Sequence, residues 1–132
     1  MTESHRCHDF PALAANGGVS SFDHREVLWA LEWAAVAPGI GGWNVLLDDI
    51  APTRLMSIIP PASREASFIV YRKNGGAVVS WVPPGSAGRS IEMKRFDDLR
   101  TALLTLCSLD RETLRQVDES VELLCSGRLR RQ

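Results

Sequence analysis

Two apolar runs in the middle of the chain flank a turn signal and predict a β-hairpin. The runs cover residues 67–73 and 77–82, and Asn74-Gly75 lies between them. A type I′ turn needs positive φ at both central residues, and this dipeptide tolerates it. The predicted cross-strand pairs are Arg72 with Ala77, Val70 with Val79, and Phe68 with Trp81.

The two faces of this hairpin differ in polarity. Because side chains alternate between the faces of a strand, one face is wholly apolar and is expected in the core. That face carries Phe68, Val70, Val79 and Trp81. The opposite face is only half polar and needs a second layer or a partner molecule to cover it. Its residues are Ile69, Tyr71, Val78 and Ser80.

Further strands and helices follow from the same patterns. Residues 43–48, 55–59 and 91–94 are typical of strands, and no helix signal interrupts them, so the sheet is expected to be antiparallel. Asp23 and Glu26 form a capping box at the start of a first helix. Two more helices follow the strands, one opening at residues 96–98 and one ending near Gly127. The predicted fold class is α+β, an antiparallel meander of about five strands flanked by one N-terminal and two C-terminal helices.

The length of 132 residues fits a single domain. Residues 1–21 are weakly patterned and are expected to form a mobile or loosely docked N-terminal arm. The α+β domain is expected to cover residues 22–127, and residues 128–132 form a basic C-terminal tail.

The first helix carries two tryptophans whose environment the sequence leaves open. Val27, Leu28, Leu31 and Ala34 share one side of this helix, and the charged Arg25 and Glu32 lie on the other. Trp29 and Trp33 fall on the flank beside the charged side, so another element or another molecule must cover them. Tryptophan is enriched at contact hot spots, which makes this pair a candidate interface.

Charge and cysteine content narrow the classes of function. The formal net charge of −1 argues against a partner held by bulk electrostatics, such as nucleic acid. The three cysteines, Cys7, Cys107 and Cys125, are an odd number without a CxxC pair, which argues against a disulfide framework. The N-terminus has no secretory pattern and no apolar run approaches the length of a membrane span, so we expect a cytoplasmic protein.

Candidate chemistry is sparse. His5, Cys7 and His8 lack the second ligand pair that a tetrahedral zinc site needs, so neither a metal nor another cofactor is predicted. Asp48 and Asp49 follow a strand and are the candidates for ligand binding or acid–base chemistry. The basic residues that could contact a nucleic-acid backbone are Arg72, Lys73, Arg128, Arg130 and Arg131.

These observations favour a non-enzymatic protein-interaction module that binds itself as a homodimer or binds another protein. No catalytic residue is assigned. The expected interface residues are Trp29, Trp33, Ile69, Tyr71 and Val78. The alternatives are a small-molecule-binding domain or small enzyme with a pocket between sheet and helices near Asp48 and Asp49, and a weak nucleic-acid-binding accessory protein.

Overall fold

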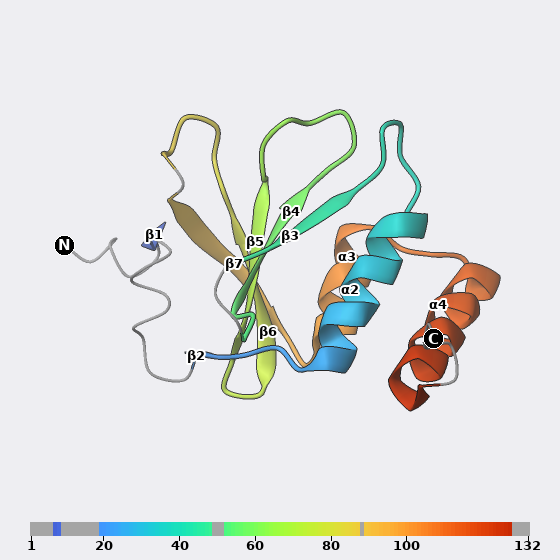
Figure 1. Ribbon diagram of the computed structural model, residues 1–132. Coiled ribbons are helices and arrows are strands. Elements are labelled where there is room, and N and C mark those ends of the chain that lie inside the picture. Colours follow the sequence, from blue (N-terminus) through green and yellow to red (C-terminus); the bar gives the residue numbers. More distant parts are fainter. Residues whose placement is uncertain (1–6, 9–18, 49–51, 88, 128–132) are drawn as a thin grey trace.

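The described strands form one antiparallel sheet, and the described helices all lie on one side of it (Figure 1). The computed structural model describes residues 7–8, 19–48, 52–87 and 89–127. In chain order the elements are β1 (Cys7–His8), β2 (Val19–Ser20), α2 (His24–Val36), β3 (Asn44–Leu47), β4 (Leu55–Ile59), β5 (Phe68–Lys73), β6 (Gly76–Trp81), β7 (Ser90–Phe96), α3 (Leu99–Leu106) and α4 (Arg111–Ser126). The predicted fold class is confirmed.

The five predicted strands form a meander in which each strand pairs with the next. Across the sheet the order is β1-β7-β6-β5-β4-β3, with β2 beside the end of β5. The hairpin register is as predicted, with Phe68 opposite Trp81 and Arg72 opposite Ala77. Asn74 and Gly75 have φ values of 51° and 83°, as a type I′ turn requires.

Two short segments that precede the first helix also join the sheet. Cys7–His8 pairs with β7, and Val19–Ser20 pairs with β5, both antiparallel. The sequence pattern predicts neither strand. The rest of the predicted arm, residues 1–6 and 9–18, lies outside the described residues.

Local capping signals position all three described helices. Asp23 and Glu26 form the predicted capping box at the start of α2. Asp98 and Asp110 are the N-caps of α3 and α4, and the side chain of each accepts the backbone N–H of the residue three positions later. Gly127 ends α4 in the left-handed conformation, at φ 81°.

The main core lies between the sheet and the helices, and it includes both tryptophans of α2. Trp29 is 6% exposed and Trp33 is fully buried, together with Ala30 on the same side of the helix. Trp33 packs on Trp43, with ring centroids 5.2 Å apart. The tryptophan side of α2 is therefore its inward side, and the indoles are covered by the protein's own elements.

Each buried indole also bonds to another helix. The Trp33 indole N–H donates to the backbone carbonyl of Cys107, at the end of α3, over 3.0 Å. The Trp29 N–H donates to the carboxylate of Asp118 in α4 over 2.8 Å. Arg100 of α3 forms a bidentate ion pair with the same carboxylate and lies over the Trp29 ring. These contacts link α2, α3 and α4, and α4 forms an outer layer on α2 (Figure 1).

The opposite face of the sheet carries a smaller cluster, and Tyr71 is at its centre. Leu55, Ile69, Tyr71 and Val78 are buried there, with Val19 and Val82 packed around them. The half-polar face of the hairpin is thus buried in this structure.

Substitutions in α2 distinguish its inward side from its outward side. We expect Trp33→Ala to lower the free energy of unfolding by about 3–5 kcal/mol, because it leaves a large cavity between sheet and helices. Leu31→Ala, at a position 40% exposed, should cost less than about 1 kcal/mol. Urea unfolding followed by circular dichroism measures both, and an equal or larger loss for Leu31→Ala would contradict the observed rotation of α2.

Acid titration tests the contact between the three helices. The hydrogen bonds from Arg100, and secondarily from Trp29, lower the pKa of Asp118 below its ordinary value of 3.8. A carboxylate with a lowered pKa stabilises the fold above the unfolded value, and this contribution is lost as the pH falls through the folded value. Asp118→Asn should therefore reduce stability at pH 7 by about 1 kcal/mol, since the pair is partly solvent-exposed, and should flatten the loss of stability below about pH 4.

The control for this titration is Asp97→Asn, in the exposed turn before α3. It should keep the acid dependence of the wild type. The same acid dependence in Asp118→Asn and in the wild type would contradict the expected role of the carboxylate.

Candidate interaction surface

The outward side of α2 is apolar and is only partly covered by the rest of the protein. Val27, Leu28 and Ala34 are half-buried at the margin of the main core, and Leu31 is 40% exposed. The sequence pattern already groups these four residues on one side of the helix. The helix therefore has two apolar sides, and only the one with the tryptophans is fully covered.

Strand β3 lies beside α2 and forms an edge of the sheet. Its one described strand neighbour is β4. Leu46, on the face away from the helices, is 53% exposed, while Val45 points into the main core. The strand sequence Asn44-Val45-Leu46-Leu47 contains no charged residue. We call the outward residues Val27, Leu28, Leu31 and Ala34 of α2, together with β3, the α2–β3 surface.

The backbone of β3 has hydrogen-bonding groups that point away from the sheet. In an antiparallel pair, alternate residues direct their N–H and C=O groups toward the partner strand. The N–H of Asp48 donates to the carbonyl of Leu55 in β4, over 3.4 Å. By alternation Leu46 also faces β4, so the backbone groups of Val45 and Leu47 point outward.

At the other end of the sheet, β7 carries several features that discourage pairing with another chain. Ser90 and Ile91 of β7 are paired with β1. The remaining outer residues of β7 include Glu92, Lys94 and Arg95, and a bulge interrupts its register with β6 between Val79 and Ser80. Charged residues and bulges are the usual protection of edge strands against pairing with other chains. The described part of β3 has neither.

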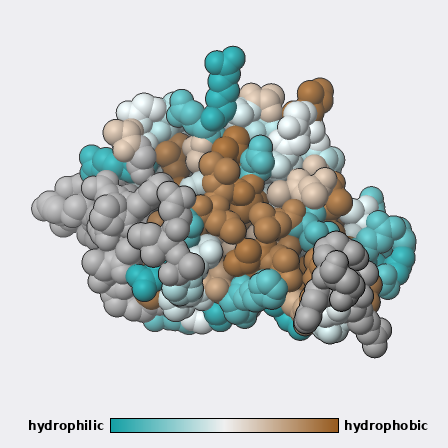
Figure 2. Space-filling model, in the orientation of Figure 1, coloured by the Kyte–Doolittle hydropathy of each residue, from teal (hydrophilic) through white to brown (hydrophobic). Residues whose placement is uncertain are grey.

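The space-filling view places these features on one face of the molecule. Figure 2 shows hydrophobic side chains gathered in the centre of the face on which β3 and α2 lie in Figure 1. Ile40, in the loop between α2 and β3, is 90% exposed. Contiguous apolar area that remains exposed on a folded protein marks a site of interaction.

A second exposed apolar group lies at the end of β6 and β7. Trp81 is 42% exposed, and its cross-strand partner Ile91 and the nearby Met93 are also exposed. The prediction that Trp81 belongs to the core is therefore wrong. It shares the helix side of the sheet with Phe68, but it lies at the strand end just before Pro83-Pro84, where the described helices leave it partly uncovered.

The structure places the five expected interface residues inside the protein. The exposed fractions of Trp29 and Trp33 are 6% and 0%, and those of Ile69, Tyr71 and Val78 do not exceed 1%. The tryptophans are covered by the core and by α3 and α4. An interface at Trp29 and Trp33, as expected from the sequence, therefore does not fit their burial in this structure. Leu31 and Leu46 of the α2–β3 surface are exposed instead.

Among the expected interface residues, Tyr71 carries a titratable hydroxyl group whose pKa is shifted. Its hydroxyl donates to Glu92 over 3.3 Å. Burial, and then the nearby Glu92 carboxylate, raise the pKa of Tyr71 to about 12. The phenol therefore stays protonated at neutral pH and acts as a hydrogen-bond donor, which suits a structural role rather than that of a general base.

The polar candidates for other functions have local partners or lie outside the described residues. Asp48 accepts the backbone N–H of Arg54 and so closes the loop between β3 and β4. Arg72 forms an ion pair with Glu26 of α2 at 3.2 Å, and Lys73 is half-buried beside the hairpin turn. The structure therefore does not bring Asp48 and the basic residues together into one site. The candidates outside the described residues are Asp49, Arg128, Arg130 and Arg131.

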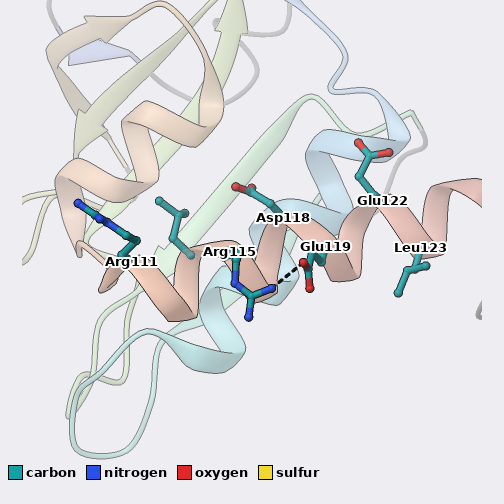
Figure 3. Close-up of a pocket in the computed structure, with 7 residues that line it drawn as sticks. Arg111, Arg115, Asp118, Glu119, Glu122 and Leu123 are labelled. Carbon is teal, nitrogen blue, oxygen red and sulfur yellow. Dashed lines mark hydrogen bonds and ion pairs between the residues drawn. The ribbon is translucent and has the colours of Figure 1, made fainter.

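A concavity of about 590 Å³ lies along one side of α4 (Figure 3). Its described lining comes from that one helix; most of the lining residues are of charged types, but the surface that they present to the concavity is largely apolar: Arg111, Leu114, Arg115, Asp118, Glu119, Glu122 and Leu123. Arg115 pairs with Glu119 at 2.6 Å and also with Glu112, and Glu122 pairs with Arg25 of α2. These charges neutralise one another, as on a solvated helix face.

The described residues contain no group of three or more metal-ligating side chains close enough to hold an ion. None of the described helices combines the length and hydrophobicity that crossing a bilayer requires. No protein-family model matches the chain, and comparison with curated proteins and with solved structures finds no significant similarity.

The sequence contains a feature that indicates an exposed, unprotected edge at β3. The strand is the first of the meander, so one of its edges is free unless another segment covers it, and its four residues are uncharged. No comparable signal identifies Leu31, because its exposure depends on how α2 is rotated against its neighbours.

Quenching of tryptophan fluorescence measures the exposure of Trp81. Trp29 and Trp33 are buried and Trp43 is half-buried, so Trp81 should dominate quenching by acrylamide. Trp81→Phe should remove most of the quenchable emission, whereas Trp29→Phe should leave it in place. Equal quenching of the wild type and of Trp81→Phe would show that Trp81 is shielded.

Proposed function

We propose that this protein is a non-enzymatic interaction module that acts as a homodimer. The observation that supports the proposal is the α2–β3 surface, where a partly exposed apolar helix side and an uncharged edge strand lie on one face of the molecule (Figure 2). A folded chain gains about 25 cal/mol for each Å² of apolar area that it removes from water. Covering Leu31 and Leu46 therefore supplies a driving force for association.

The charge of the protein is compatible with self-association. The formal net charge is −1, so two copies repel each other only weakly. Within the α2–β3 surface the defined residues carry no charge, so its burial leaves no unpaired ion in the interface. We place the protein in the cytoplasm, in keeping with the free thiols of Cys107 and Cys125.

Light scattering coupled to size-exclusion chromatography tests the proposal. As concentration rises, the mass of the wild type should approach twice the 14.6 kDa of one chain. Leu31→Arg should weaken association more than about tenfold, because it places an unpaired charge in the contact.

The matched control is Gln116→Arg, which adds the same charge at an exposed position of α4. It should keep the wild-type mass, and thermal melts should show that both variants stay folded. A wild type that stays at the mass of one chain at every concentration would overturn the proposed homodimer.

A further inference from the structure

We propose that β3 pairs antiparallel with β3 of a second copy, across a twofold axis on which Leu46 faces its own counterpart. This inference rests on the proposed function and specifies the geometry of the same surface. It joins the two sheets edge to edge into one continuous sheet.

The outward backbone groups of β3 determine the register. Val45 and Leu47 have N–H and C=O groups that point away from β4, as the bond between Asp48 and Leu55 shows. In an antiparallel ladder, residues with such groups lie directly opposite each other. A twofold pairing that uses both residues sets Val45 opposite Leu47 of the other copy, and so sets Leu46 opposite Leu46.

The side chains of β3 suit this register. Leu46 is 53% exposed and would form the non-hydrogen-bonded pair, in which opposite side chains come closest. At the ends of the ladder Asp48 would lie opposite Asn44, so no two like charges face each other.

The position of α2 explains why the partner is a second copy. The helix contacts β3, and hydrophobic side chains gather on the face of the molecule where both elements lie (Figure 2). A twofold axis at Leu46 brings the same side of the other α2 toward it, so that both Leu31 side chains approach the interface. A lone extended peptide on β3 would satisfy the backbone groups but would bring no such helix.

The other edge of the sheet explains why the pairing closes as a dimer. Head-to-tail association would require β3 to meet β7, and repeated contacts of this kind build open filaments. Residues 90–91 of β7 are already paired, and the rest of that edge carries charges and a bulge. The isologous contact between two β3 strands avoids these obstacles.

A cysteine placed on the proposed axis tests the geometry. Opposite residues of a non-hydrogen-bonded pair have Cα atoms about 4.5 Å apart, within the range that a disulfide spans. Under mild oxidation Leu46→Cys should therefore form a covalent dimer, and peptide mapping should show that the disulfide joins the two introduced thiols. The control is Ile40→Cys, which is more exposed, at 90%, but lies off the axis. It should cross-link more slowly by on the order of tenfold or more, because its thiols do not share the high local concentration at the axis.

Amide hydrogen exchange of the unmodified protein provides a second measurement. The N–H groups of Val45 and Leu47 should exchange more slowly as the protein concentration rises, because dimerisation pairs them. The N–H of Leu46 faces β4 in the single chain, so its exchange should change much less.

The possible outcomes separate this inference from the proposed function. A dimer by light scattering in which Leu46→Cys cross-links no faster than Ile40→Cys, and in which Val45 and Leu47 gain no protection, would overturn the β3 pairing and leave the homodimer intact. A protein that is monomeric at every concentration would overturn both. Fast cross-linking of Leu46→Cys together with protection of Val45 and Leu47 would support both.

Discussion

The indoles of Trp29 and Trp33 determine how the helices sit on the sheet. An indole combines a large apolar area with one N–H group that needs an acceptor once it is buried. In this protein the Trp33 N–H donates to the backbone carbonyl of Cys107, at the end of α3. The Trp29 N–H donates to the side-chain carboxylate of Asp118, in α4. Satisfying both N–H groups fixes the rotation of α2, because any other rotation would bury an unpaired donor or expose an aromatic ring.

The rotation of α2 has a direct consequence for the surface. With the tryptophans inward, Leu31 faces outward, although it is also apolar. The helix α4 packs on another part of α2, where it contacts Trp29 and Arg25, and Leu31 stays 40% exposed. The apolar surface beside β3 thus results from the packing of the core.

The two edges of the sheet differ in charge and in strand pairing, and this difference favours association through the β3 edge. The β7 edge combines strand pairing, a bulge and charged side chains, including Lys94 and Arg95. The β3 edge combines outward backbone groups with the exposed Leu46 and lies beside the outward side of α2. A proposed dimer through β3 would bury unpaired backbone groups and apolar area in a single step, which is the combination that edge-strand recognition uses.

The sequence alone determined the features that depend on neighbours along the chain. The turn at Asn74-Gly75 fixed the hairpin register through its backbone preference, and Asp23 fixed the start of α2 through a hydrogen bond three residues away. Only the tertiary structure decided which apolar side of α2 is buried and that Trp81 is exposed. The periodicity of a helix or strand shows which residues share a side, but burial also depends on which distant elements cover that side, and α3 and α4 come some 70 or more residues later, as the bonds of Trp33 and Trp29 show.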